Sequence, residues 1–222
     1  MLIALANQKG GSGKTTISVH LAAMLGRDAS VIVLDADPQG SALAWIAGDE
    51  AKPDGSGELH NGLSMPIDVA SIAGHGRSTH EYIQAAELDY DHVIIDCPPS
   101  ADLTAVQSIL LVIDQLIVPV IPSATDMRAA SAIIDLADKA NNNRDEAINR
   151  HYVINQNRGG RVLSREIEDA LAPTAPVLAS RIGERESYRK AGAINESAWA
   201  IGDDEARRDF RKLTKELTGN GK

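Results

Sequence analysis

The sequence lacks three features that mark large classes of protein: paired cysteines, long apolar runs and an excess of positive charge. It has one cysteine among 222 residues, so it can form no internal disulfide and cannot build a thiolate metal centre. No apolar run approaches the roughly 18 residues that a membrane-spanning helix requires. These absences exclude thiol and cluster chemistry, and we expect a cytoplasmic protein.

Positive charge is the third feature in short supply, because 31 acidic residues outnumber 22 basic ones and leave a formal net charge of −9. Binding to nucleic acid would therefore depend on a local basic patch. One such segment lies near the C-terminus, where only Asp209 and Glu216 oppose the basic residues. Its members are Arg207, Arg208, Arg211, Lys212, Lys215 and Lys222.

Short aliphatic runs alternate along the chain with segments of helical periodicity, which predicts an α/β fold with a doubly wound, mostly parallel sheet flanked by helices. We expect one domain over residues 1–217 and a frayed tail over 218–222. The predicted strands are Leu2 to Ala6, Val31 to Asp35, His92 to Asp96, Leu116 to Ile121 and Tyr152 to Asn155. The predicted helices are Lys14 to Leu25, Ala101 to Ile113, Arg128 to Ala140, Val162 to Leu171 and Glu205 to Leu217.

Two other segments carry no regular pattern. The stretch Asp49 to Gly62 is rich in Gly, Asp and Pro, and we expect an exposed loop there, after a short helix. The first residues, Met1 to Ala6, have no basic flank and no cleavage site, so we expect no signal peptide.

The strongest motif is a glycine-rich loop between the first predicted strand and a long helix. It consists of Lys9, Gly10, Gly11, Ser12, Gly13, Lys14, Thr15 and Thr16. Glycines let the backbone curl with its N–H groups pointing inward, and the helix N-terminus adds positive potential, so the loop is suited to a polyphosphate. Lys14 would reach the β- and γ-phosphates, Thr15 would ligate Mg²⁺, and Thr16 would contact the α-phosphate.

Two further motifs follow strands of the same predicted sheet. The second strand ends in Asp35-Ala36-Asp37-Pro38-Gln39-Gly40, and the carboxyl ends of parallel strands meet at one edge. The third ends in Asp96, followed by Cys97-Pro98-Pro99. Asp96 is placed to meet Mg²⁺ through a water, as in a Walker B strand. An alternative for Asp37 is to cap the helix that follows Pro38.

Lys9 makes the first motif more specific, because a general phosphate loop needs no lysine at its start. The segment resembles the deviant Walker A motif, KGGxGKT, of the ParA/MinD superfamily, most closely the short ParA-type partition and positioning ATPases. Asp35 to Gln39 resembles the DxDPQ switch I of that family, and Asp96 to Pro99 resembles its DxPP switch II.

The resemblance implies an ATPase that uses ATP and Mg²⁺ and works as a homodimer. The residue matching Lys9 is the family's signature lysine, which reaches the nucleotide of the partner subunit. Asp37 would orient the attacking water and lie at the metal site with Thr15 and Asp96. Catalysis would then rest on Lys9, Lys14 and Asp37, with hydrolysis weak until a partner stimulates it.

The second half of the chain resembles the family less specifically. The stretch Val118 to Ser123, with Asp126, matches a loop that helps to form the dimer face, and Arg181 to Gly192 matches a loop that flanks the base. Asn155 stands where this fold places an adenine-recognising amide. Arg211 and its basic neighbours stand where ParA-like proteins bind DNA phosphates without reading sequence. The alternative for these cations is a solvated helix face that complements the helix dipole.

Three functions remain open from the sequence. The first is a ParA-like ATPase that binds nucleoid DNA and positions a plasmid, a chromosome locus or a protein assembly such as a carboxysome, with an activating cargo-adaptor protein. No helix-turn-helix segment precedes the loop, so we expect no sequence-specific repression. The second is a metabolic enzyme on the same loop. The third is a MinD-like membrane regulator, which the polar tail Thr218 to Lys222 disfavours.

Overall fold

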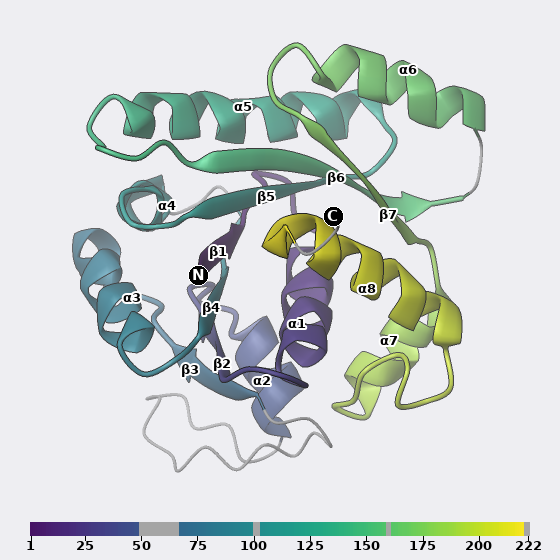
Figure 1. Ribbon diagram of the computed structural model, residues 1–222, viewed down its shortest axis with the longest axis horizontal. Coiled ribbons are helices and arrows are strands. Elements are labelled where there is room, and N and C mark those ends of the chain that lie inside the picture. Colours follow the sequence, from purple (N-terminus) through teal and green to yellow (C-terminus); the bar gives the residue numbers. More distant parts are fainter. Residues whose placement is uncertain (49–66, 100–102, 159–160, 220–222) are drawn as a thin grey trace.

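The chain forms a parallel β-sheet with helices on both faces. The structure is a computed structural model that describes residues 1–48, 67–99, 103–158 and 161–219, with the backbone alone for Leu103 and 161–165 (Figure 1). Seven strands lie in the order β3-β2-β4-β1-β5-β6-β7, and every neighbouring pair is parallel. Their bounds are β1 Leu2–Leu5, β2 Val31–Asp35, β3 Asp68–Ser71, β4 His92–Asp96, β5 Gln115–Val120, β6 Asn149–Asn157 and β7 Val177–Gly183.

Helices cover the sheet in two layers (Figure 1). One face carries α3 (Thr79–Glu87), α4 (Leu103–Leu110), α5 (Ala124–Asn141) and α6 (Arg161–Leu171), with the short 3₁₀ helix η2 (Gly76–Ser78) beside α4. The other carries α1 (Lys14–Leu25), α2 (Ser41–Ala47), α7 (Glu186–Ala193) and α8 (Asp204–Thr218). In the described residues, no helix is long and apolar enough to cross a membrane.

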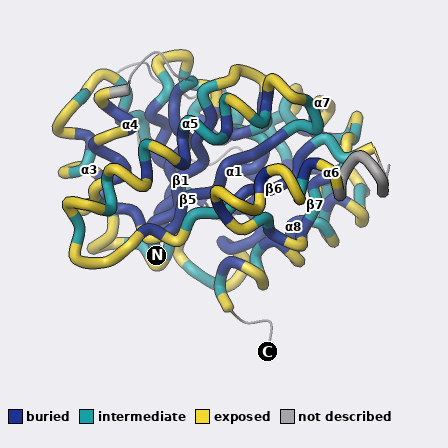
Figure 2. The backbone as a smooth tube through the Cα atoms, turned by 90° about the horizontal axis from the view of Figure 1, so that it is seen from above, coloured by how far each residue is buried: buried dark blue, intermediate teal, exposed yellow. Residues whose placement is uncertain are grey.

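The central strands are buried on both faces, which explains why they are apolar without alternation. In β1, Leu2 and Ala4 join the apolar cluster under α3 to α6, whereas Ile3 and Leu5 join the cluster under α1, α2 and α8. Figure 2 shows this division as a buried interior enclosed by helices whose outer sides are exposed.

The predicted fold class is confirmed, and all five predicted strands lie within the sheet. The sequence missed the two edge strands, β3 and β7. Edge strands are less buried, and β7 alternates buried residues such as Leu178 and Ser180 with more exposed ones, so neither has a continuous apolar run. It also missed α3 and α7, which are only 9 and 8 residues long.

Two predicted segments fall wholly or partly outside the described residues. The expected loop over Asp49 to Gly62 lies outside the described residues, although the short helix before it is present as α2. Helix α8 ends at Thr218 with Gly219 as its C-cap, and residues 220–222 lie outside the described part. The single domain over 1–217 and the frayed tail therefore stay predictions.

The sheet order brings the motif residues together. Strand β4 lies between β1 and β2, so Asp96 is in register with Leu5 on one side and with Asp35 on the other. The glycine-rich loop that follows β1 and the two aspartates therefore share one edge, formed by the carboxyl ends of the strands.

Candidate functional site

The glycine-rich loop joins β1 to α1 with a backbone that depends on glycine. Gly11 and Gly13 have φ values of 75° and 94°, in the left-handed region that other residues avoid. Gly13 has a second requirement, because a Cβ there would lie 2.0 Å from Nδ2 of Asn155. No atom of the described residues lies within 4 Å of a Cβ built at Gly10 or Gly11. The loop is therefore an uncovered cradle of backbone groups at the start of a helix, which suits an anion.

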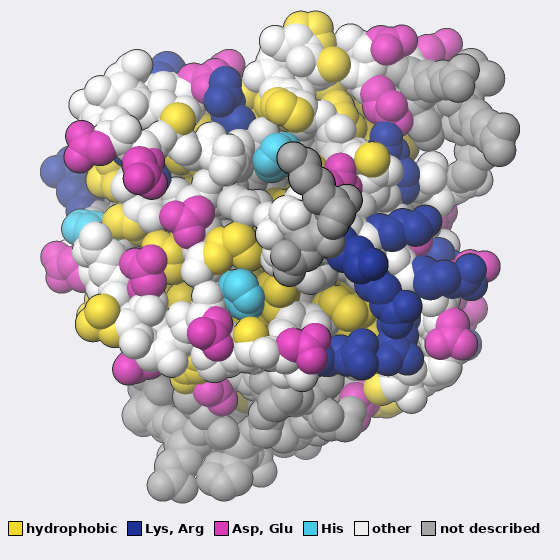
Figure 3. Space-filling view, in the orientation of Figure 1, with side chains coloured by type: hydrophobic (Ala, Val, Ile, Leu, Met, Phe, Trp, Pro, Cys, Tyr) yellow, Lys and Arg dark blue, Asp and Glu magenta, His cyan; other side chains and the backbone are white. Residues whose placement is uncertain are grey.

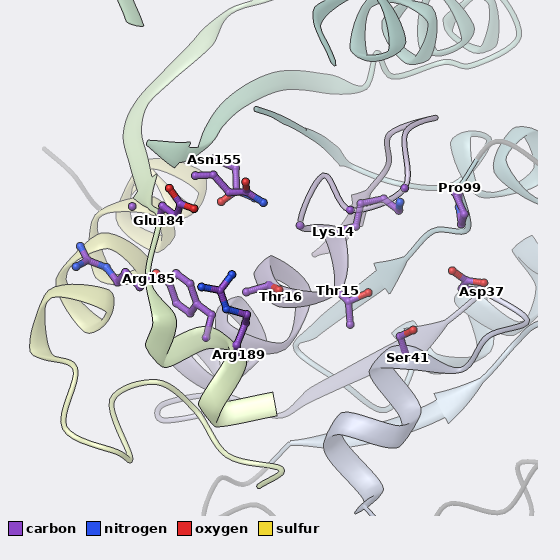
Figure 4. Close-up of a pocket in the computed structure, with 16 residues that line it drawn as sticks. Lys14, Thr15, Thr16, Asp37, Ser41, Pro99, Asn155, Glu184, Arg185 and Arg189 are labelled. Carbon is purple, nitrogen blue, oxygen red and sulfur yellow. The ribbon is translucent and has the colours of Figure 1, made fainter. Parts of the chain in front are cut away.

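The loop forms the floor of a cavity of about 340 Å³ (Figure 4). Lys14, Thr15 and Thr16 line it from the first turn of α1, and Asp37, Ser41 and Pro99 border one side. The opposite side comes from the ends of β6 and β7 and from α7, through Asn155, Gln156, Gly183, Glu184, Arg185, Tyr188 and Arg189. The cavity thus has a phosphate-suited side and a second side of aromatic and charged groups.

Thr15 and Asp96 form the centre of the phosphate side. The Thr15 hydroxyl donates a hydrogen bond to Oδ2 of Asp96 at 2.6 Å, and Ser18 donates to Oδ1 at 3.2 Å. Asp96 is almost fully buried, and burial raises the pKa of its carboxyl to about 7. The sequence missed Ser18, although its place three residues after Thr15 on one helix face was a usable signal.

These groups fit a magnesium ion. A hydroxyl and a carboxylate are hard oxygen ligands, and Mg²⁺ is commonly held by one or two such groups together with phosphates and waters. Among the described residues, no cluster of three or more His, Cys, Asp or Glu side chains could hold a metal without such help. Thr15 would ligate the ion directly, and Asp96 would hold one of its waters.

The two switch I aspartates have different surroundings. The Asp35 carboxylate accepts three backbone N–H bonds, from Asp37 at 3.0 Å, Ala42 at 2.8 Å and Leu43 at 2.9 Å. Burial raises the pKa of Asp35 against these bonds. Asp37 is half-buried, accepts one bond from the Gln39 N–H at 3.0 Å, and lines the cavity.

The alternative role for Asp37, as the cap of the next helix, is therefore wrong. Helix α2 begins at Ser41 with Gly40 as its N-cap, and Asp35 accepts from its first-turn amides. Asp35 accepts these bonds because it is the last residue of β2, and its buried carboxylate lies beneath the turn that leads into α2. Asp37 stays available to a group inside the cavity.

Lys9 has a partner within its own chain. Its ammonium Nζ lies 2.6 Å from Oδ2 of Asp126, near the start of α5. The Lys9 side chain is 43% exposed, whereas Asp126 is 1% exposed. Asp126 also accepts from the Ser123 hydroxyl, and Ser123 caps α5 by accepting from the Asp126 N–H. Oδ1 of Asp126 is buried without a partner among the described residues.

Asn155 contacts the loop. Its Nδ2 donates to the Ser12 carbonyl at 2.7 Å, and the side chain packs on Gly13. This contact fixes the loop from β6 and uses one amide proton, so recognition of adenine by Asn155 stays a prediction. The next residue, Gln156, has a φ of 50°, an uncommon conformation for a residue other than glycine, and it also lines the cavity.

The loop Arg181 to Gly192, expected beside the base, contributes four residues to the cavity beyond Gly183. Arg185 is held by Glu205 at 2.6 Å and by Asp209 at 2.9 Å, both on α8. Tyr188 is buried, which raises the pKa of its phenol. No local sequence pattern identifies these individual residues, because their partners are distant in the chain.

A buried histidine connects the phosphate loop to α8. Nδ1 of His20 lies 2.8 Å from the Thr16 carbonyl, and Nε2 accepts the Ala198 N–H at 3.1 Å. These bonds assign the proton to Nδ1, and burial lowers the pKa of His20 to about 4. Four aromatic rings surround it, with centroids 5.0 to 5.5 Å away: Trp45, Tyr188, Trp199 and Phe210.

The C-terminal basic residues form an exposed surface on α8 (Figure 3). Arg208, Arg211, Lys212 and Lys215 are exposed, and Arg207 is half-buried. The neighbouring acids are engaged elsewhere: Asp209 by Arg185, and Glu216 by the backbone of Ala179 and Ser180. Among the described residues, Arg211, Lys212 and Lys215 form no ion pair. Phe210, Leu213 and Leu217 pack inward, as expected.

Comparisons with known proteins agree with this site. The maintenance of carboxysome distribution protein A of Halothiobacillus neapolitanus is 28% identical over 202 residues, 90% of this chain and 87% of that protein. The chromosome-partitioning ATPase Soj of Thermus thermophilus is 37% identical over 117 residues, 44% of this chain and 46% of that protein.

A solved structure has a similar fold. The septum site-determining protein MinD of Pyrococcus horikoshii, complexed with Mg-ADP, superposes with a TM-score of 0.76 at 19% identity, over 97% of this chain and 95% of that one. Residues 3–198 match the family described as the CobQ/CobB/MinD/ParA nucleotide binding domain. This match spans the glycine-rich loop, both aspartate motifs and the second side of the cavity, and the chain therefore belongs to the MinD/ParA family of nucleotide-binding proteins.

Proposed function

We propose that this protein is an ATP-dependent dimerising switch ATPase that positions or segregates a cargo by nucleotide-dependent, non-specific binding to DNA. The observation that carries the proposal is the pairing of Thr15 with Asp96 at 2.6 Å, beside an open glycine cradle. A hydroxyl and a carboxylate in that place fit the Mg²⁺ that accompanies a nucleotide triphosphate.

The chain's own groups supply positioning and charge. Backbone N–H groups of Gly10 to Gly13 hold the phosphates, and Lys14 offsets the charge on the β- and γ-phosphates. Thr15 and Asp96 would hold Mg²⁺, which would offset charge on the same phosphates. Asp37 accepts a hydrogen bond from the attacking water and orients it for in-line attack. With these groups alone we expect hydrolysis in the isolated subunit to be slow.

Lys9 makes the fast reaction depend on a second subunit. In the monomer its ammonium pairs with Asp126, away from the cavity. Lys9 is nearly half exposed, so its side chain can leave that pair and reach a nucleotide in a facing subunit. A cation delivered there stabilises charge on the leaving phosphate, as an arginine finger does.

Helix α8 supplies the contact with DNA. Arg208 lies 4.0 Å from Glu205, whereas Arg211, Lys212 and Lys215 form no ion pair with another described residue. The neighbouring carboxylates of Glu216 and Asp209 are held by β7 and by Arg185. Phosphate contacts by such cations are independent of base sequence and fall off with salt. The aromatic cluster around His20 packs the first turns of α1 against Phe210 of α8, so the cavity and this surface share a rigid connection.

The names of two relatives refer to carboxysome distribution and chromosome partitioning. These names support a cargo of the same kind, a protein assembly or a DNA locus. We propose a cytoplasmic, nucleoid-associated protein whose hydrolysis is stimulated by a cargo-adaptor protein.

The proposal is tested by binding to random-sequence duplex DNA, followed by fluorescence anisotropy across a salt series. Wild type, Arg211→Ala and Asp37→Ala are each measured with ATP, with ADP and without nucleotide. Arg27→Ala is the matched control, because Arg27 is an exposed arginine in the loop after α1. We expect salt-sensitive binding with ATP only, kept by Asp37→Ala and Arg27→Ala.

Arg211→Ala should weaken binding several-fold and reduce the slope of log affinity against log salt by about one. A sample that dimerises with ATP but binds DNA with none of the nucleotides would contradict the proposed binding to DNA. It would leave the ATPase itself in place.

A further inference from the structure

A second cavity lies on the opposite face of the sheet from α8, far from any residue assigned to nucleotide or DNA. It has a volume of about 350 Å³ and lies between α4, α5 and η2. Leu110, Leu111 and Leu136 provide its apolar surface, and Arg77 and Lys139 stand at its rim. Leu111 is 46% exposed and lines the cavity, so part of its apolar surface is open to solvent.

Hydrogen bonds hold the walls of this groove in place. The Ser108 hydroxyl on α4 donates to the Arg77 carbonyl at 2.9 Å and accepts the His80 N–H at 3.0 Å. At the other end, the guanidinium of Arg144 donates to the carbonyls of Leu110 at 3.0 Å and Ile113 at 2.8 Å. These bonds cap the C-terminus of α4, so the groove is preformed.

The charge around the groove identifies the kind of occupant. Among the described residues that line the groove none is acidic, although the chain has a net charge of −9. Arg77 and Lys139 are exposed, and neither forms an ion pair with another described residue. An apolar strip between two helices with free cations at its edges complements a helix that has leucine-like residues on one face and carboxylates beside them.

We propose that this groove is the docking site for an acidic amphipathic helix of a protein partner. Its apolar residues at positions i, i+3 or i+4, and i+7 fill the space over Leu110 and Leu136. Its carboxylates pair with Arg77 and Lys139.

Both helices that form the groove are connected along the chain to residues of the nucleotide site. Helix α4 follows the segment that contains Asp96 and Pro99, and α5 begins beside Asp126, the partner of Lys9. A helix bound between α4 and α5 therefore contacts the helix that follows switch II in the chain and the helix whose first turn carries Asp126. The partner that docks here is the one that regulates hydrolysis, a statement that rests on the proposed function, whereas docking itself does not.

The test selects 16-residue peptides from a random display library on the wild-type protein without nucleotide, and measures chosen synthetic peptides by fluorescence anisotropy. We expect selected peptides with net negative charge and apolar residues at helical spacing. Leu111→Glu should weaken their binding at least tenfold, and Arg77→Glu several-fold.

Matched controls carry the same changes outside the groove. Leu88→Glu alters a leucine that is 87% exposed at the end of α3, and Arg27→Glu alters an exposed arginine on the other side of the sheet. Both should bind the peptides as wild type does. Circular dichroism and basal ATP hydrolysis of Leu111→Glu should equal those of wild type, which separates failure of docking from failure of the ATPase.

Three outcomes would overturn the proposal. The first is that no selected peptide distinguishes Leu111→Glu from Leu88→Glu. The second is that the selected peptides are basic. The third is that duplex DNA displaces them and itself binds Leu111→Glu and wild type equally, which would make the cations a nucleic-acid surface.

Discussion

The two sides of the nucleotide cavity are built in different ways. On the phosphate side, polar groups bind one another inside the protein: Thr15 and Ser18 with Asp96, and Asp35 with the amides of its own turn. On the other side, α7 is held by ion pairs to α8 at the surface, and Tyr188 packs in an aromatic cluster. Phosphoryl transfer needs fixed geometry, whereas a base needs only a shaped and partly apolar wall. Substitutions on the phosphate side should therefore have the larger effects on the free energy of unfolding and on ATP hydrolysis.

The sharpest test of this view uses the two neighbouring aspartates, Asp35 and Asp37. Asp35→Ala leaves three buried or half-buried N–H groups unpaired and should lower the free energy of unfolding by about 3 kcal/mol. Asp37→Ala should leave that free energy within about 0.5 kcal/mol of wild type and lower kcat for ATP hydrolysis about 100-fold. Urea unfolding and steady-state hydrolysis measure the two effects. Rapid turnover by Asp37→Ala would contradict the role given to it.

His20 tests the connection between the two sides through pH. The pKa of His20 is about 4 in the folded protein and 6.5 in the unfolded chain, so below pH 6.5 the unfolded state binds a proton that the folded state does not. The contribution of His20 to stability should be fully present above pH 6.5, fall as the pH drops toward 4, and change no further below it. The loss at pH 5 should be about 2 kcal/mol.

The measurement is urea unfolding from pH 7 to pH 4. His20→Gln should remove most of this pH dependence, although it also lowers stability at pH 7 by disturbing the aromatic cluster. His75→Gln, at an exposed position on the opposite face, should keep it. Asp96, whose pKa is raised to about 7, contributes with the opposite sign over this range, so the test is the difference in stability between wild type and His20→Gln. A difference that is the same at pH 7 and pH 5 would show that His20 is not held neutral.

The smallest expected effect concerns the pair of Lys9 and Asp126. A double-mutant cycle with Lys9→Ala and Asp126→Ala should give a coupling energy of about 1 kcal/mol, because Lys9 is 43% exposed and solvent screens the pair. The same cycle on Lys190 and Glu186, an exposed pair at 3.3 Å, should give no more than about 0.5 kcal/mol. Equal couplings would remove the special status of Asp126 as the resting partner of Lys9.

The sequence predicted the phosphate side well because each of its parts is local. A strand, a glycine turn and a helix within 25 residues determine the loop, and an aspartate at the end of a strand needs only the parallel sheet to reach it. The alternative role for Asp37, as a helix cap, is wrong because that contact is not decided locally. The capping carboxylate came from Asp35, which the sheet holds below the turn, and spacing along the chain does not reveal that.

The sequence by itself determined the α/β class, the glycine-rich loop and the carboxylates that face it, because local backbone preference and apolar periodicity specify those features. Tertiary structure alone decided the partner of Lys9, the contact of Asn155 with Ser12, the fixing of Arg185 by α8 and the groove between α4 and α5. Each of these joins segments that are distant along the chain. Their contacts depend on how the sheet orders its strands, and a side chain's neighbours across a sheet are not written in its own stretch of sequence.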